Sequence, residues 1–134
     1  METSPTWLHS TTFAAEPISA KRARAFVGAR LIEHRLWHLV DPVRVVASEL
    51  VTNAVVQGPA PITLTLSAST EDVVLSLRRP GSDLPRQRVP PEKELRGLGL
   101  TIVEVLSRSW GVTTDDDGGR ELWASFPARA RSAT

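Results

Sequence analysis

One segment of the chain combines a strong helical pattern with two polar side chains beside its apolar face. Apolar residues of the segment 41–56 recur at the spacing of one helix face: Val43, Val46, Ala47, Leu50 and Ala54. Asp41 is predicted to be the N-cap and Pro42 to take the first helical position. Glu49 and Asn53 lie four residues apart, so they stand one above the other at the edge of the apolar stripe. The segment therefore predicts a core helix that carries a carboxylate and a carboxamide at its margin.

This pair of side chains allows two interpretations. A carboxylate can act as a general base, and a carboxamide oxygen can bind a hard cation such as Mg²⁺. Alternatively, Glu49 and Asn53 form a solvated helix margin with a simple polar contact between neighbouring turns. Taken alone, this helix favours the simpler interpretation.

A second segment, 96–106, opens with glycine and then becomes helical. The apolar stripe of this predicted helix comprises Leu98, Ile102, Val105 and Leu106. Gly97 and Gly99 would let the backbone approach a ligand closely, and free N–H groups at a helix start favour phosphate. The segment is not a P-loop, because no Gly-Lys-Ser/Thr follows, and it lacks the third glycine of a dinucleotide-binding fingerprint. A tight turn into a helix remains the alternative.

Together the two segments resemble the ATP-binding proteins of the Bergerat fold, which include histidine kinases and DNA gyrase. The run Glu49-Leu-Val-Thr-Asn53 is similar to their N box, and Gly97-Leu-Gly-Leu-Thr-Ile-Val103 to their glycine-rich G2 box. Two runs, Ser48-Glu-Leu-Val-Thr-Asn-Ala-Val55 and Trp110-Gly-Val112, resemble those of one branch of the family, the anti-sigma factor serine/threonine kinases of bacteria. The resemblance extends from about Ala20 to Phe126.

The resemblance implies a fold, a chemistry and partners. The fold is an α/β (α+β) two-layer sandwich, in which a mostly antiparallel sheet packs on helices. Glu49 is the general base, Asn53 binds Mg²⁺, and the cofactors are ATP and Mg²⁺. Four further residues are assigned to the nucleotide site: Gly81, Gly97, Leu98 and Gly99. The partners are a sigma factor and an anti-sigma-factor antagonist, with a homodimer possible and no direct contact with nucleic acid or membrane.

The chain departs from the family pattern at the adenine end of the site. Arg79 stands where the G1 box has an aspartate that accepts a hydrogen bond from the adenine amino group. Arginine has donors and no acceptor, so it cannot replace that carboxylate. Asp83 and Leu95 also stand where glycines are usual, and Gln57 where many relatives have histidine. A degenerate, non-catalytic binding module with weak or no ATP binding therefore remains the alternative to a kinase. A detached sensor-kinase domain is less favoured, because no phosphoacceptor-histidine helix precedes the domain.

Composition indicates a single globular domain in the cytoplasm. The chain has 134 residues, of which 41% are hydrophobic and 23% charged, with no cysteine and a net charge of +1. This charge is too small to indicate nucleic-acid binding, no apolar run is long enough to span a membrane, and the N-terminus does not resemble a signal peptide. We expect an N-terminal edge strand or arm over 1–15, an ATP-binding domain over 16–127 and a frayed tail over 128–134.

The remaining elements follow from periodicity and turn residues. The expected elements are a strand at 7–13, a helix at 18–36, strands at 62–66 and 73–77, a lid-like loop at 78–96 and a hairpin of 110–114 with 121–126. The four tryptophans are predicted to be core or half-buried anchors. The three histidines are predicted to be ordinary surface residues without a metal-binding pattern, and Asp115–Asp117 to form a solvated turn.

Overall fold

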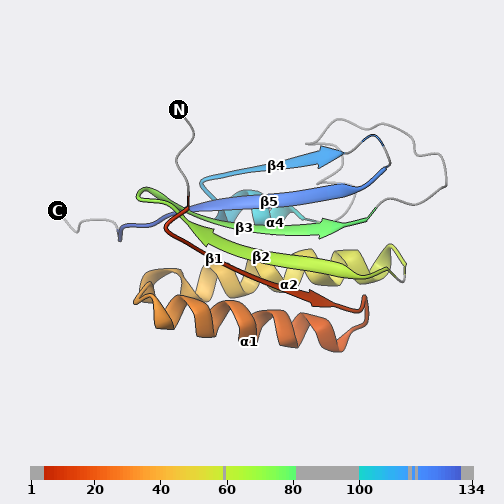
Figure 1. The fold of residues 1–134 in the computed structure, drawn as a ribbon, viewed down its shortest axis with the longest axis horizontal. Helices are drawn as coiled ribbons and strands as arrows, with labels where there is room; N and C mark the ends of the chain where they lie inside the picture. Colours follow the sequence, from red (N-terminus) through yellow and green to blue (C-terminus); the bar gives the residue numbers. More distant parts are fainter. Residues whose placement is uncertain (1–4, 59, 81–99, 115, 117, 131–134) are drawn as a thin grey trace.

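The chain folds into two layers, a sheet and a set of helices that cover one of its faces (Figure 1). The computed structural model describes residues 5–58, 60–80, 100–114, 116 and 118–130. Its elements in chain order are β1 (Trp7–Phe13), α1 (Ile18–Glu33), the 3₁₀ turn η1 (Trp37–Leu39), α2 (Val40–Val56), β2 (Ile62–Ala68), β3 (Asp72–Arg79), α4 (Thr101–Leu106), β4 (Ser109–Thr114) and β5 (Arg120–Pro127). The described residues form a five-stranded sheet in the order β1-β2-β3-β5-β4, with every neighbouring pair antiparallel. The predicted α+β sandwich is therefore confirmed.

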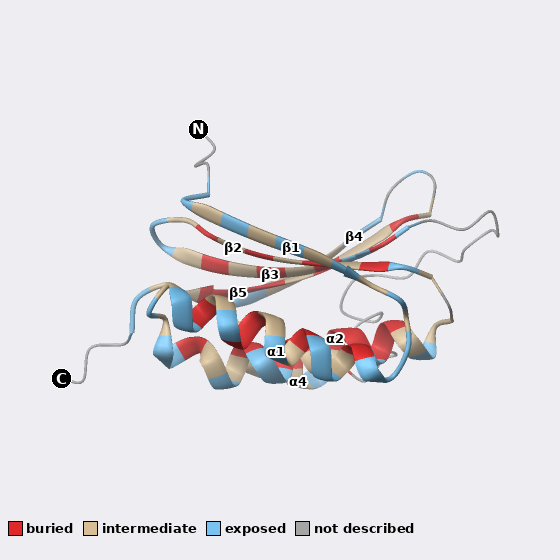
Figure 2. Ribbon diagram, turned by 60° about the horizontal axis from the view of Figure 1, so that its bottom comes forward, coloured by how far each residue is buried: buried red, intermediate tan, exposed pale blue. Residues whose placement is uncertain are grey.

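The core lies between the sheet and the helices. Burial alternates along β2 and β3, so that every second residue faces the helical layer (Figure 2). The pairing register places Leu64 opposite Leu77 and Leu66 opposite Leu75, which gathers these buried side chains on one face. The helices contribute the other half of this core, chiefly from α1 and α2.

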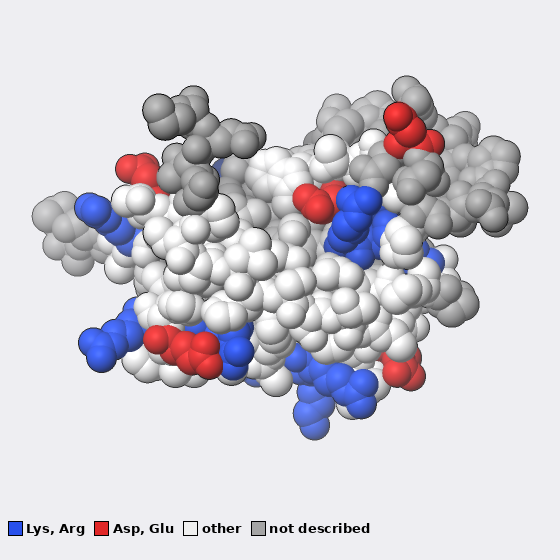
Figure 3. All heavy atoms as spheres, viewed as in Figure 1, with Lys and Arg blue, Asp and Glu red and all other residues white. Residues whose placement is uncertain are grey.

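The predicted edge strand is confirmed as β1, whose only strand neighbour among the described residues is β2. On the face away from the helices, cross-strand hydroxyl pairs link Ser10 to Thr65 and Thr12 to Thr63. On the side of the molecule seen in Figure 3, most charged side chains lie near the outline, one group of basic and acidic side chains lies right of centre, and the surface between them is uncharged. A sheet with one face on the core and one hydroxyl-rich face is typical of antiparallel architecture.

Helix α1 ends earlier than its sequence pattern predicts. The helix stops at Glu33, and His34 and Arg35 turn the chain away from the axis. Arg35 has a φ of 59°, its N–H donates to Ile32 O, and the N–H of Leu36 donates to Leu31 O. These two bonds form a Schellman end, which normally places glycine at the left-handed position. The prediction that the helix continues to Leu36 was wrong because no glycine marks its end.

Helix α2 begins one residue before its predicted cap. The turn η1 runs directly into Val40, so Asp41 and Pro42 both lie inside the first helical turn. Asp41 is therefore not the N-cap, although a carboxylate there still interacts favourably with the helix dipole. Pro42 is tolerated because the N–H groups of the first turn have no partner within the helix. Trp37, in η1, is 62% exposed, which contradicts its prediction as an anchor.

Helix α4 is short and has a different buried face from the predicted one. Leu100 and Val103 are buried beside α2, whereas Ile102 and Leu106 are half-buried. Val105 is 70% exposed, so its predicted place in the apolar stripe was wrong. Because the helix begins only at Thr101, its rotation is set by the buried Leu100 and Val103 rather than by a long stripe.

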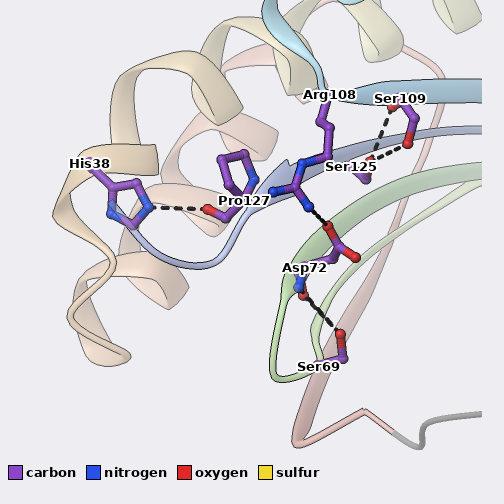
Figure 4. A network of polar contacts seen from close by, with 7 residues as sticks. All are labelled: His38, Ser69, Asp72, Arg108, Ser109, Ser125 and Pro127. Carbon is purple, nitrogen blue, oxygen red and sulfur yellow. Dashed lines mark hydrogen bonds and ion pairs between the residues drawn. The ribbon is translucent and has the colours of Figure 1, made fainter. Parts of the chain in front are cut away.

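Polar contacts connect the end of β5 to other elements (Figure 4). A ring nitrogen of His38 lies 3.1 Å from the carbonyl oxygen of Pro127, so that nitrogen must carry the donated proton. Arg108 forms an ion pair with Asp72 at 2.7 Å, between the start of β4 and the start of β3. His38 therefore links the turn η1 to the last residue of β5.

Candidate functional site

Helix α2 fixes the positions of Glu49 and Asn53. Its buried residues Val46, Leu50 and Ala54 face the sheet and set the rotation of the helix. Glu49 is then half-buried, and Asn53 is 8% exposed one turn later. The structure therefore places the predicted pair on adjacent turns at the margin of the core.

The carboxylate of Glu49 has no hydrogen-bond or ion-pair partner among the residues that the structure describes. A half-buried carboxylate without such a partner is available to accept a proton from a group brought beside it. This geometry is compatible with the predicted role of Glu49 as a base.

Asn53 is held by its neighbour one turn later. The Nε2 of Gln57 donates to the Oδ1 of Asn53 at 3.0 Å. A carboxamide oxygen has two lone pairs, so this bond by itself leaves ligation of a cation possible. Gln57 thus orients the carboxamide that sequence reasoning proposed as a Mg²⁺ ligand.

Arg79 has a structural environment that its sequence context did not reveal. Its side chain is 8% exposed and points from the end of β3 to the C-terminal end of α2. One terminal nitrogen donates to Ala54 O at 2.6 Å, and the other donates to Gly58 O at 2.9 Å, with Gln57 O at a longer 3.4 Å. The guanidinium therefore acts as a side-chain cap on α2.

The helix end explains why a guanidinium fits there. In a continuing α-helix the N–H of Gly58 would donate to Ala54 O. Here it donates to Val55 O instead, so the carbonyl of Ala54 does not receive that bond. Gly58, at φ 120°, turns the chain so that its own carbonyl lies beside that of Ala54, within reach of one forked donor. A cation at a helix C-terminus also interacts favourably with the helix dipole. Arginine supplies both the fork and the charge.

The comparison with protein families identifies the fold family. The model of the histidine kinase-, DNA gyrase B-, and HSP90-like ATPases matches residues 39–130. This chain belongs to that family. The match includes α2, the sheet beyond β1 and α4, so the ATPase-family assignment covers the helix with Glu49 and Asn53. A comparison with curated proteins finds no match.

Membership of this ATPase family implies ATP, usually with Mg²⁺, and the structure allows a test of how well the residues fit these ligands. At the position that the resemblance assigns to the metal, Asn53 has a carboxamide oxygen, a ligand type that Mg²⁺ accepts, and Glu49 lies one turn before it. At residue 79, which the resemblance assigns to adenine recognition, the fit is poor, because arginine offers donors only, and these are directed at the carbonyls of Ala54 and Gly58. The fit of the described residues to ATP and Mg²⁺ thus differs between the positions that the resemblance assigns to the metal and to adenine.

Several predicted site residues lie outside the described part of this ATPase domain. They are Gly81, Asp83, Leu95, Gly97, Leu98 and Gly99. Their assignment to the nucleotide site stays a prediction. In the described part of the domain, no helix is long and apolar enough to cross a membrane.

The structure also brings together two histidines that sequence reasoning treated as separate surface residues. The Nε2 atoms of His9 and His34 lie 3.0 Å apart. Their separation in sequence, between a strand and the end of a helix, hid this proximity, and no spacing rule would have revealed it. With Glu33 they form a group of three potential ligand side chains, which the spacing of the histidines in the sequence did not indicate.

Proposed function

We propose that this protein is an anti-sigma-factor-type regulatory protein with a serine/threonine protein kinase fold, which binds ATP–Mg and phosphorylates an anti-sigma-factor antagonist. The observation that carries the proposal is the uncommitted carboxylate of Glu49 one turn before Asn53. The sequence of the N box and the run Trp110-Gly-Val112 support the assignment to this branch of the family. A sigma factor would be the second partner, and the site of action would be the cytoplasm.

In this proposal each residue of the α2 pair has one task. Glu49 accepts the proton of the antagonist's serine hydroxyl as the oxygen attacks. Asn53, oriented by Gln57, is the residue that would hold Mg²⁺. ATP, when bound, supplies the phosphoryl group that is transferred. Gly81, Gly97, Leu98 and Gly99 would contact the nucleotide, as the resemblance implies.

The proposal includes an altered adenine site. Arg79 takes the place of the aspartate in the G1 box, and its donors are used to cap α2. The adenine amino group then lacks its usual acceptor, which costs on the order of 1–3 kcal/mol if the group is buried. Weak nucleotide binding is therefore part of the proposed function.

A pair of glutamate variants tests the kinase. Transfer of labelled phosphate from γ-labelled ATP to candidate antagonist proteins of the same organism is measured together with calorimetry of Mg·ATP binding. Glu49→Gln should retain nucleotide binding and lose transfer, because only the base is removed. Glu71→Gln, which changes an exposed glutamate in the turn between β2 and β3, should alter neither property.

The second candidate is a non-catalytic binding module of the same fold. The observation that favours it is the capping role of Arg79, because the residue at the adenine position serves the stability of the helix. In that case the wild-type protein would transfer no phosphate to any antagonist. Glu49→Gln and Asn53→Ala would then bind the partner as tightly as the wild type does.

A further inference from the structure

A second cluster of ligand-type side chains lies where the edge strand β1 meets the C-terminal end of α1. The cluster consists of His9, Glu33 and His34, whose potential ligand atoms all lie within 4.8 Å of one another. We propose that this cluster binds one divalent transition-metal ion of the zinc type and thereby clips β1 to α1. The proposed site is independent of the ATPase site on α2 and of the proposed function.

The two imidazole nitrogens lie nearly at the separation that a metal requires. Their Nε2 atoms are 3.0 Å apart, so one ring donates an N–H to the lone pair of the other. In a tetrahedral zinc site with Zn–N bonds of 2.0–2.1 Å, two ligand nitrogens are about 3.3–3.4 Å apart. The two nitrogens point at one another, with ring centroids 5.2 Å apart, so a metal ion can replace the shared proton once both rings turn toward a common point beside the present bond.

Both rings are positioned by the fold without a metal. His9 is paired with Leu66 in the β1–β2 register, so it lies on the side of β1 that faces the helices. The indole of Trp7 stacks on His34 with centroids 4.0 Å apart and planes 4° apart, and it also contacts His9 at 5.4 Å. Ligand rings that neighbouring side chains already orient lose little freedom when a metal binds.

The backbone around His34 adds to the site. His34 is the C-cap of α1, and its N–H donates to Arg30 O. A cation held at this position lies at the negative end of the helix dipole. The left-handed turn at Arg35 leads the chain away from the helix immediately after His34. The helix end thus supplies a favourable electrostatic setting for a bound cation.

Glu33 provides the third ligand. Its carboxylate forms an ion pair with Arg30 at 2.8 Å, so metal binding requires this exposed pair to give way or to share the carboxylate. Two imidazoles and one carboxylate are ligands that suit Zn²⁺ and related ions, with water completing the coordination. The chain has no cysteine and only one other histidine, His38, which contacts Pro127. His38 is therefore a built-in control.

The first experiment follows the three imidazoles in the wild-type protein by ¹H–¹⁵N NMR during titration with ZnCl₂. The resonances of His9 and His34 should shift together and saturate at one zinc per chain, and those of His38 should stay in place. MgCl₂ should cause no such shift, because Mg²⁺ prefers oxygen ligands. If His38 responds as strongly as the pair does, or if the pair does not respond, the proposed site is refuted.

Calorimetry with ZnCl₂ then assigns the ligands. His9→Gln and His34→Gln should each abolish the one-to-one binding event, whereas His38→Gln should retain it. Trp7→Leu removes the ring that orients His34, and it should weaken zinc binding roughly ten- to a hundredfold. Circular dichroism confirms that each variant is folded. Zinc affinity in His9→Gln or His34→Gln equal to that of His38→Gln would overturn the assignment.

Discussion

The capping role of Arg79 makes a quantitative prediction about stability. Arg79→Met keeps the length of the side chain and removes the guanidinium that donates to Ala54 O and Gly58 O. A hydrogen bond from a charged donor contributes about 1.5–3 kcal/mol, and a buried carbonyl left without a partner adds to the loss. Gly58 is half-buried, so water can partly replace its bond, whereas Ala54 is buried. We therefore expect the free energy of unfolding to fall by about 2–4 kcal/mol.

Urea unfolding followed by tryptophan fluorescence measures this loss. For a domain of this size, a loss of 2–4 kcal/mol lowers the midpoint by about 1–2 M urea. The matched control is Arg22→Met, because Arg22 is an exposed arginine on α1. Its expected effect is within about 0.5 kcal/mol of the wild type. If the two variants unfold at the same urea concentration, Arg79 does not cap α2 in solution and the reasoning fails.

Arg79→Asp has two opposing effects. The variant supplies the carboxylate that the resemblance assigns to adenine recognition, so nucleotide binding should improve if residue 79 is the main defect. It also places a negative charge at the negative end of α2, beside the carbonyl oxygen of Ala54. We therefore expect Arg79→Asp to be less stable than Arg79→Met, and adenine binding must be measured at a temperature where the variant is folded. The double variant Arg79→Asp/Asp83→Gly tests whether the missing second glycine of the G1 box also limits nucleotide binding.

Three further predictions concern the nucleotide and the outer face of the sheet. This protein should bind Mg·ATP roughly ten- to a hundredfold more weakly than a relative with an intact G1 aspartate does, and with little preference over GTP. Tight, adenine-selective binding in calorimetry would contradict the role given to Arg79. Asn53→Ala should weaken the Mg²⁺-dependent part of nucleotide binding and leave any metal-free binding unchanged, which a titration with EDTA distinguishes. Gly111→Ala should lower the free energy of unfolding by about 1–3 kcal/mol, because the added Cβ would meet the Trp123 ring at 2.6 Å. The double variant Gly111→Ala/Trp123→Leu should recover part of this loss. An unchanged urea midpoint in Gly111→Ala would show that the indole moves aside freely.

Local sequence determined the fold class and most of the elements. The period-two alternation in β2 and β3 and the apolar stripe of α2 require one buried face each, so the sheet and helix follow from the positions of apolar residues alone. The same stripe placed Glu49 and Asn53 at its margin, because residues four apart share a helix face. These inferences succeeded because each depends only on neighbours along the chain.

The tertiary structure decided the residues whose partners are distant in sequence. Arg79 caps a helix end more than twenty residues before it, at Ala54 and Gly58, and His9 meets His34 across the gap between a strand and a helix. The end of α1 at Glu33 was also hidden, because an arginine takes the left-handed position that usually requires glycine. The periodicity of apolar residues indicates which side of a helix or strand is buried, but it does not indicate which other element packs against that side. Only the packing of β3 against the end of α2, and of β1 against the end of α1, brings these polar groups within bonding distance.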